Sequence, residues 1–410
     1  MLRRVLTCFA LLMICTSTFG QGAAWIGSWG ASPLPATAAG GPFPGSPSFT
    51  DQTIRQIVRL SAGGQQLRLR LTNEYGTQPL TIGAARVAIA AGGALEPGSE
   101  RIVTFAGNPS AVISTGAPLL SDPIDLAVDD LATLSISLYL PEATGPCTCH
   151  ATGMEAAFVS AAGDFTAGTF TPSETIQARA FLSGVEVLTD AAGAIVALGD
   201  SITDGVGSTS GANRRWPDLL AERLAARRRG GMFGVVNHGV SGNRVLNDGA
   251  GESALARFDR DVLSVPGASH VIVFEGVNDL GLAFGRFEGP FAAIRDQMPP
   301  GMPTTQATMI AGYRQLIARA HAAGLKVYGA TIAPYEGAAY FSPEGEAARQ
   351  AVNAWIRDSG ELDGVLDFDA VLRDPAKPSQ MKEGMHSGDF LHGSDAGYRA
   401  LAESVNLALF

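Results

Sequence analysis

Cysteine is scarce in this sequence, with four residues in a chain of 410. Two of them, Cys8 and Cys15, lie in the N-terminal apolar run, and the other two, Cys147 and Cys149, stand beside His150 in a C-x-C-H run. A zinc site needs more ligands than two thiols and one imidazole, so this run does not predict one. A local disulfide, which an oxidising compartment permits, and two unpaired structural thiols remain open alternatives.

Charged residues are also few, at 17%, and the acidic ones outnumber the basic ones, which gives a formal net charge of −10. This balance excludes nucleic acid and an anionic membrane surface as the main partner. An apolar content of 46% indicates a globular chain and excludes a disordered one. The length of 410 residues exceeds one ordinary hydrophobic core and predicts two domains.

No apolar run is long enough to span a bilayer. The first residues, with Arg3 and Arg4, precede a short apolar run over residues 5–15 and then small residues. This pattern predicts a secretory signal peptide over residues 1–24, with cleavage after Gly20 or Ala24. A lipid anchor at Cys15 is disfavoured, because the bulky residue before it stands where a small one is needed. We therefore expect a secreted or periplasmic protein without stable membrane insertion.

The sequence also lacks the patterns of common cofactor sites. Its histidines form no H-E-x-x-H pair, and its glycine-rich loops lack the clustered carboxylates of a calcium or magnesium site. Gly205, Gly207 and Gly211 have one residue too many for the dinucleotide fingerprint, and no P-loop lysine accompanies them. We predict no metal and no cofactor, and these spacings disfavour a nucleotide-binding protein.

Residues 25–189 show the period-two alternation of β-strands. Leu67, Leu69 and Leu71 alternate with arginines, and the apolar residues of 134–140 alternate with Ser135 and Ser137. Several such segments with no helical pattern between them predict an all-β sandwich domain over residues 25–189. Near its start, Trp25 and Trp29 suit packing against the second domain better than stacking on a sugar.

From residue 194 onward the texture changes to continuous apolar runs separated by helical patterns. The runs cover residues 194–198, 235–237, 271–274, 326–332 and 365–368, and such runs are typical of buried parallel strands. Ser342-Pro343 has the composition of a helix start. Residues 190–410 are thus predicted to form an α/β domain with a doubly wound parallel sheet, whose ligands lie at the carboxyl ends of the strands.

Polar loops follow three of these strands and place reactive groups at that edge. They carry Ser201 in Gly-Asp-Ser-Ile-Thr-Asp-Gly, Gly242 in Ser-Gly-Asn, and Asn278 in Gly-Val-Asn-Asp, while Asp389 and His392 stand near the end of the chain. A hydroxyl nucleophile needs a base, and the base needs an orienting group. Ser201, His392 and Asp389 supply these roles. The backbone N–H groups of Ser201 and Gly242 and the amide of Asn278 are the predicted oxyanion donors.

These four blocks resemble those of the SGNH hydrolases, also called the GDSL esterase and lipase family. The segment from Tyr313 to Tyr398 is also similar to a two-domain secreted bacterial subgroup with an N-terminal β-domain. The resemblance implies a three-layer α/β/α, flavodoxin-like domain and cofactor-free hydrolysis of carboxylic esters with short acyl chains. Gly393 departs from the pattern, since many relatives have proline after the histidine, but this change removes no catalytic group.

Structural roles are predicted for residues near these candidates. Asp200 is expected to bond the loop backbone, and Asp279 to hold the loop of Asn278. His386 has Glu383 three residues before it, but that context matches no known catalytic block, so His392 is the predicted base.

The sequence leaves other functions open. The same site suits a carbohydrate O-deacetylase or an acyltransferase, so the expected partner is a small-molecule or glycan ester. A non-catalytic glycan-binding protein is the remote alternative, and an assay on a generic ester would distinguish it from a hydrolase. The absence of a Pro/Ser-rich linker favours a structural β-domain over a tethered glycan module. The sequence carries no signal for the oligomeric state.

Overall fold

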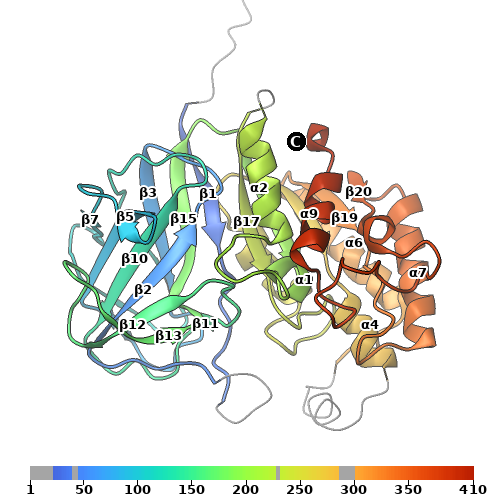
Figure 1. The fold of residues 1–410 in the computed structure, drawn as a ribbon, viewed down its shortest axis with the longest axis horizontal. Helices are drawn as coiled ribbons and strands as arrows, with labels where there is room; N and C mark the ends of the chain where they lie inside the picture. Colours follow the sequence, from blue (N-terminus) through green and yellow to red (C-terminus); the bar gives the residue numbers. More distant parts are fainter. Residues whose placement is uncertain (1–21, 39–44, 228–230, 286–300) are drawn as a thin grey trace, which may run out of the picture.

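The computed structural model describes residues 22–38, 45–227, 231–285 and 301–410. The predicted signal peptide over residues 1–24 lies almost entirely outside the described residues. Strands gather on one side of the molecule and a mixture of helices and strands on the other (Figure 1). Within the described ranges, no helix is long and apolar enough to cross a membrane.

The N-terminal part, called the β-domain below, contains two antiparallel sheets. In order across the first sheet, the strands are β1 (Ala24–Gly30), β15 (Leu182–Thr189), β3 (Gln66–Thr72) and β9 (Pro118–Leu120). The second sheet has the order β13 (Pro172–Ile176), β12 (Ala157–Ala162), β2 (Gln52–Arg59), β10 (Thr133–Leu140), β5 (Ala84–Ala91) and β6 (Ala94–Leu95), with β7 (Arg101–Ile102) also paired to β5.

Both sheets contribute to a single hydrophobic core. Leu67, Leu69 and Leu71 of β3 belong to the same buried cluster as Leu134 and Ile136 of β10. The alternation in β10 differs from the prediction, because its serines are buried as well as its leucines. β10 lies between β2 and β5, and long side chains of these neighbours cover its polar face: Arg55 of β2 donates to the hydroxyl of Ser137 at 2.9 Å.

Two short strand pairs complete the β-domain. β4 (Leu80–Ile82) pairs with β8 (Ala111–Ile113), and β11 (Cys149–His150) pairs with β14 (Arg179–Ala180). Cys149, in β11, forms a disulfide with Cys147, and both residues are buried. Of the two alternatives left open by the sequence, the structure has the disulfide.

The second part, called the α/β domain below, contains a five-stranded parallel sheet. Its strand order is β17 (Phe233–Gly239), β16 (Gly193–Gly199), β18 (Ala268–Phe274), β19 (Lys326–Ala330) and β20 (Gly364–Leu366). The strand earliest in the sequence is flanked by the second and third, which is a doubly wound order. The predicted runs all fall on these strands, and the last two strands end two residues earlier than predicted.

The helices of the α/β domain pack in two groups. One group consists of α2 (Trp216–Ala226), α8 (Phe368–Leu372) and α9 (Asp395–Ser404). The other consists of α3 (Ala254–Phe258), α4 (Val277–Phe284), α6 (Gln306–Ala322) and α7 (Pro343–Asp358). Ser342 caps α7 by accepting from the N–H of Gly345 at 3.0 Å, as its sequence predicts. Short helical segments are α1 (Ser201–Asp204), a π-helix (Asp259–Leu263) and a 3-10 turn (Leu407–Leu409).

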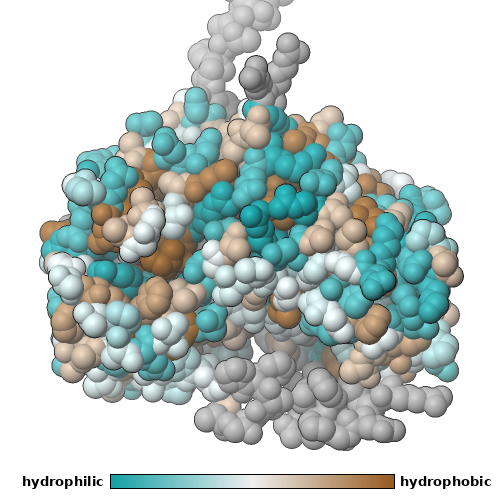
Figure 2. Space-filling model, in the orientation of Figure 1, coloured by the Kyte–Doolittle hydropathy of each residue, from teal (hydrophilic) through white to brown (hydrophobic). Residues whose placement is uncertain are grey.

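The two domains meet where β1 packs against β17, between β15 and the parallel sheet (Figure 1). Gly27 and Gly234 let the two backbones approach, since a Cβ on Gly234 would lie 2.1 Å from the carbonyl oxygen of Gly27. Across the same interface, Ser61 accepts a hydrogen bond from the N–H of Val235 at 2.8 Å. Hydrophilic residues gather over the middle of the face in Figure 2, where α2 lies.

Candidate functional site

The predicted nucleophile Ser201 is the first residue of α1, directly after β16 and Asp200. Asp200 caps this helix, because its Oδ1 accepts a hydrogen bond from the N–H of Ile202 at 2.9 Å. Gly205 ends the helix after one turn with a φ of +103°, a conformation that glycine adopts without steric cost. The sharp turn from strand to helix therefore presents the Ser201 hydroxyl at the carboxyl end of β16.

His392 connects the serine to a carboxylate. Its Nε2 lies 2.9 Å from Ser201 Oγ, and its Nδ1 lies 2.6 Å from Asp389 Oδ2. Because a carboxylate only accepts hydrogen bonds, Nδ1 carries the proton of the neutral ring. Nε2 is then free to accept the proton of the Ser201 hydroxyl. The three residues predicted from sequence spacing thus form one hydrogen-bonded chain.

Asp389 is fixed by its own turn. Its Oδ1 accepts from the N–H groups of Leu391 at 3.0 Å and His392 at 2.9 Å. Partial burial alone would raise the pKa of Asp389, but hydrogen bonds from the side chain and backbone of His392 and from Leu391 lower it to about 2. Phe390, inside the turn, has a φ of +59°, which is unusual for a bulky residue. These bonds hold the strained turn that brings Asp389 onto the imidazole.

Gly242 lies in the loop after β17 and has a φ of +80°. A Cβ at this position would lie 2.8 Å from the Cβ of Ala250, so conformation and space both require glycine. Among the described residues, no backbone acceptor bonds the N–H of Gly242 or that of Ser201. Both groups therefore remain available as donors to a ligand.

Asn278 lies in the first turn of α4 and is buried. Its Nδ2 donates to the carbonyl of Asn243 at 2.9 Å, and its Oδ1 accepts from the hydroxyl of Tyr340 at 3.2 Å. These two bonds fix which end of the side chain is the amide nitrogen. Because Nδ2 carries two hydrogens, one donor remains for a ligand beside the Gly242 loop.

Asp279 holds a neighbouring loop as well as its own helix start. Its two carboxylate oxygens accept from the N–H groups of Val245 at 2.7 Å and Leu246 at 3.1 Å. Both of these residues belong to the segment that follows Gly242. Asp279 is therefore structural, as expected. In addition to its expected role at the loop of Asn278, it holds the loop of Gly242.

Arg257, a buried arginine on α3, forms hydrogen bonds to the ends of β16 and β17 and to the loop that follows β17. Its guanidinium donates to the carbonyl of Gly199 at 3.0 Å, the carbonyl of His238 at 2.7 Å and the Oδ1 of Asn243 at 2.9 Å. Asp261 accepts from it at 2.9 Å and balances its charge. The ends of β16 and β17 are thus fixed at one point under the site.

Two buried carboxyl groups, Asp200 and Glu275, lie next to each other beneath the nucleophile turn. Burial raises the pKa of Asp200 to about 7, and burial together with the nearby charge of Asp200 raises the pKa of Glu275. Two like charges in one buried site disfavour each other, so the pair resists carrying its full negative charge.

The competing base His386 is engaged elsewhere. Its Nδ1 accepts from the N–H of Gly388 at 3.1 Å, and its ring stacks on Phe390 at 4.3 Å between ring centres. It supports the turn that carries Asp389 and His392. Gly393, which departs from the family pattern, lies against Tyr398, where a Cβ would approach the ring to 2.9 Å.

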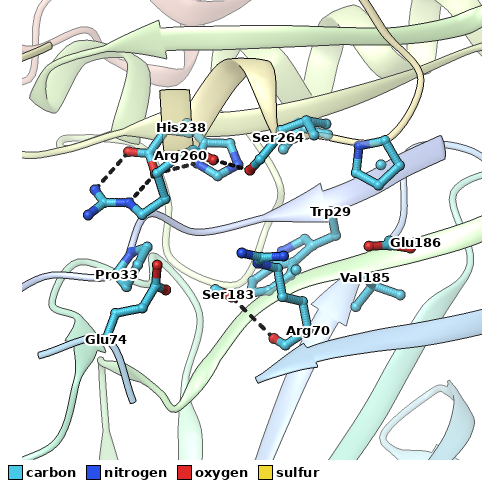
Figure 3. A pocket seen from close by; sticks show the side chains of 16 residues that line it. Trp29, Pro33, Arg70, Glu74, Ser183, Val185, Glu186, His238, Arg260 and Ser264 are labelled. Atoms are coloured by element: carbon cyan, nitrogen blue, oxygen red, sulfur yellow. Dashed lines mark hydrogen bonds and ion pairs between the residues drawn. The ribbon is translucent and has the colours of Figure 1, made fainter. Parts of the chain in front are cut away.

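Trp29 lines a small cavity between the two domains (Figure 3). Arg70 and Glu186 also line it from the β-domain, and His238 and Arg260 from the α/β domain. The cavity has a volume of about 40 Å³, whereas ligand sites usually have about 300–1,000 Å³. It has room for water but not for an ester substrate. Trp29 therefore packs at the domain interface, as the sequence suggested.

Sequence reasoning missed the residues that join the site to the β-domain. His150 Nε2 lies 2.9 Å from Asp204 Oδ1, and Ser32 Oγ lies 3.0 Å from His238 Nδ1 and 3.2 Å from an Arg257 nitrogen. The available signal was Asp204, a carboxylate three residues after the nucleophile. Nothing in the local pattern around His150 pointed to it as the partner.

A comparison with known protein families gave a match. Residues 197–400 match the model of the GDSL-like lipase/acylhydrolase family. A search of curated proteins found no match. Similar solved structures include a G-D-S-L family lipolytic protein from Desulfitobacterium hafniense (24% identity, TM-score 0.36, covering 51% of this chain and 95% of that one). They also include an acetylxylan esterase mutant from Geobacillus stearothermophilus (20%, 0.38, 52% and 92%) and an aryl esterase from M. smegmatis (17%, 0.38, 52% and 96%).

The matched segment begins in β16 and ends in α9, so it contains the Ser201 turn, the Gly242 and Asn278 loops and the Asp389–His392 turn. Residues 197–400 of this chain belong to the GDSL-like lipase/acylhydrolase family.

Proposed function

We propose that this protein hydrolyses carboxylic esters through an acyl-enzyme on Ser201. The observation that carries the proposal is the hydrogen-bonded chain from Ser201 Oγ through His392 to Asp389, with contacts of 2.9 and 2.6 Å. A serine hydroxyl is a weak nucleophile until an oriented base takes its proton. Family membership supports hydrolase chemistry at the same loops.

In the first half-reaction, Ser201 Oγ attacks the ester carbonyl carbon while His392 Nε2 accepts the hydroxyl proton. The imidazolium that forms is stabilised by the ionised Asp389. The carbonyl oxygen becomes negative and receives hydrogen bonds from the N–H groups of Ser201 and Gly242 and from Asn278 Nδ2. The intermediate then expels the alcohol, which takes its proton from His392, and the acyl group stays on Ser201.

In the second half-reaction, His392 removes a proton from water, and the resulting hydroxide attacks the acyl carbonyl. The same three donors stabilise the second oxyanion. Ser201 leaves as the acid is released and recovers its proton from His392, so the cycle consumes one ester and one water without a cofactor.

Replacement of the nucleophile tests this function. Ser201→Ala should fold normally and lower kcat on nitrophenyl acetate by at least about 10⁴-fold, the scale of losing a serine nucleophile. Ser208→Ala is a matched control, because this hydroxyl lies in the loop after α1 and, within the described part of the chain, bonds only the carbonyl of Gly205. A folded Ser201→Ala enzyme with less than about tenfold loss would refute the assignment.

The substrate proposal is a small-molecule or glycan ester with a short acyl chain, outside the cytoplasm. The Cys147–Cys149 disulfide supports an oxidising compartment. Initial rates on acetyl, butyryl and octanoyl nitrophenyl esters, measured beside acetate release from acetylated polysaccharide, would rank these classes. A preference for the polysaccharide would assign the enzyme as a carbohydrate deacetylase.

We also infer the finer architecture from the packing. Two antiparallel sheets around one core support an all-β sandwich over residues 25–189. Two separate helix groups around a parallel sheet support a three-layer α/β/α domain over residues 190–410.

A further inference from the structure

Asp204, the last residue of α1, joins two loops of the site. It is buried, and its Oδ2 accepts from both the N–H and the hydroxyl of Ser241, at 3.0 and 2.6 Å. Ser241 immediately precedes Gly242, and Asp204 lies in the same helical turn as Ser201. The position of this carboxylate therefore sets the nucleophile relative to one of the proposed oxyanion donors.

The other oxygen of Asp204 is held by a residue of the β-domain. His150 Nε2 lies 2.9 Å from Asp204 Oδ1, and His150 Nδ1 lies 3.1 Å from the carbonyl oxygen of Ser32. His150 follows the Cys147–Cys149 disulfide and is part of β11, so its backbone is restrained on both sides. His150 is 5% exposed. No other atom of the β-domain in the described residues bonds Asp204.

The partners of His150 determine its charge. A carbonyl oxygen and a carboxylate oxygen can only accept hydrogen bonds. A neutral ring has one N–H, so it would leave a nitrogen lone pair facing an oxygen in a buried site. With Asp204 as a carboxylate, both contacts are satisfied only when both nitrogens carry protons. The geometry therefore favours the imidazolium form of His150.

The surrounding charges are consistent with this form. Burial lowers the pKa of His150, but Asp204 and the Ser32 carbonyl outweigh burial and raise the pKa above its ordinary value. Arg215 opposes the positive charge, although its own guanidinium is paired with Asp218 at 2.8 Å. On the far side of Ser32, the charge of Arg257 is balanced by Asp261 at 2.9 Å.

We propose that His150, as a buried imidazolium, is a positioning residue of the hydrolase site, so that the β-domain completes the active centre through Asp204. The proposal rests on the proposed function. His150 touches no substrate. It fixes the rotation of the Asp204 carboxylate, and Asp204 fixes the Ser241–Gly242 peptide relative to Ser201. Loss of the imidazolium frees the carboxylate to turn away from Ser241 and displaces the Gly242 N–H from the developing oxyanion.

The test uses the full chain with His150→Gln and His150→Phe. Glutamine can still donate to Asp204 but carries no charge, and phenylalanine keeps the ring volume without a donor. His321→Gln is the matched control, because His321 also pairs with an aspartate, Asp363, at 2.8 Å. The His321 side chain is 44% exposed and lies near the end of α6, before the start of β19. It is therefore at the amino ends of the strands, away from the site. Circular dichroism and thermal unfolding identify the variants that are folded.

Folded His150 variants should lose kcat on nitrophenyl acetate on the order of 10- to 100-fold with KM nearly unchanged, because small displacements of catalytic groups act on the transition state. Phenylalanine should cost more than glutamine, and His321→Gln should match wild type. The rate at which a fluorophosphonate labels Ser201 should fall in the same order, and this readout requires no turnover. A folded His150→Gln enzyme with kcat and labelling rate within about twofold of wild type would overturn the proposal.

The charge of His150 allows a second, independent test of the proposal. Its imidazolium contributes fully below the ordinary histidine pKa and is lost as pH rises through the raised pKa in the folded protein. Wild-type kcat should therefore decline at alkaline pH, and His150→Gln should lack this decline. Nitrogen-15 NMR at pH 7, assigned by comparison with His150→Gln, should show two protonated ring nitrogens. A neutral ring would overturn the proposal even if His150→Phe failed to fold. A folded Ser201→Ala enzyme with less than about tenfold loss of kcat would instead refute the proposed function.

Discussion

Asn278 is the side chain whose role can be tested most cleanly at the scale of single residues, because its partners fix its orientation. Asn278→Ala should fold and lose about 10²–10³-fold in kcat, or about 3–4 kcal/mol, since an oxyanion donor acts mainly in the transition state. Steady-state kinetics on nitrophenyl acetate would measure this loss. Asn108→Ala, in an exposed turn of the β-domain, is the control. An effect confined to KM would show that Asn278 binds ground-state substrate instead.

Some single residues could be predicted from the sequence and others could not. Asp389 and His392 were accessible because a separation of three residues lets the carboxylate reach the ring. Ser201 lies 191 residues from His392, and the resemblance of the four blocks to a known family was what joined it to them. His150 was inaccessible because it belongs to none of these blocks and its partner lies in the other domain. A lone histidine carries no periodicity, and only the packing of β11 against the nucleophile turn gives it a partner.

At the scale of elements, the Gly242 loop allows a paired glycine experiment. Gly242 and Gly324 both have a φ of +80°, but a Cβ at Gly242 would meet Ala250 at 2.8 Å, while a Cβ at Gly324 meets nothing within 4 Å. Each alanine substitution should cost about 1 kcal/mol or more of unfolding free energy, because left-handed backbone disfavours a side chain. Chemical denaturation would measure that cost.

The two glycine variants should separate in activity. Gly242→Ala must move the loop to relieve the contact with Ala250, which shifts the proposed donor N–H, so kcat should fall at least about tenfold. Gly324→Ala lies after α6, away from the site, and should keep wild-type kcat. Equal kcat for both variants would contradict a role for the Gly242 N–H in stabilising the oxyanion.

The parallel strands could be predicted from their sequence pattern, whereas the burial of β10 could not. Continuous apolar runs identified the five parallel strands, because a strand buried on both faces has no polar side to display. The alternation of β10 identified a strand but not its surroundings. Ser135 and Ser137 are buried because β10 is central in its sheet and neighbouring side chains cover it. The sequence pattern reports polarity, whereas burial depends on neighbours that come from elsewhere in the chain.

At the scale of the whole molecule, the two domains are expected to depend on each other. Residues 190–410 expressed alone would expose the outer edge of β17, with Val235 and Val236, which are 5% and 2% exposed in the full chain. An uncovered strand edge promotes aggregation. The fragment would also lack His150 beside Asp204. We expect it to be insoluble or to hydrolyse nitrophenyl acetate far more slowly than a chain that begins at Trp25.

Sedimentation and specific activity of the soluble fraction would measure this outcome. Addition of separately produced residues 25–189 during refolding is the control, since restored turnover would show that the missing surface, and not damage to the fragment, causes the loss. A soluble fragment with full activity on small esters and a deficit only on acetylated polysaccharide would instead identify the β-domain as a tethered glycan module.

β1 pairs with β15, from Ala24 opposite Thr189 to Gly30 opposite Gly184, and it also contacts β17. In the order of biosynthesis, β1 leaves the ribosome long before either partner exists. Its sheet cannot close until Thr189 has emerged, and its contact with the α/β domain must wait for β17. Such distant pairings raise the contact order and slow folding. A nascent chain of this topology therefore leaves β1 without its partner strand until about half of the chain has been made.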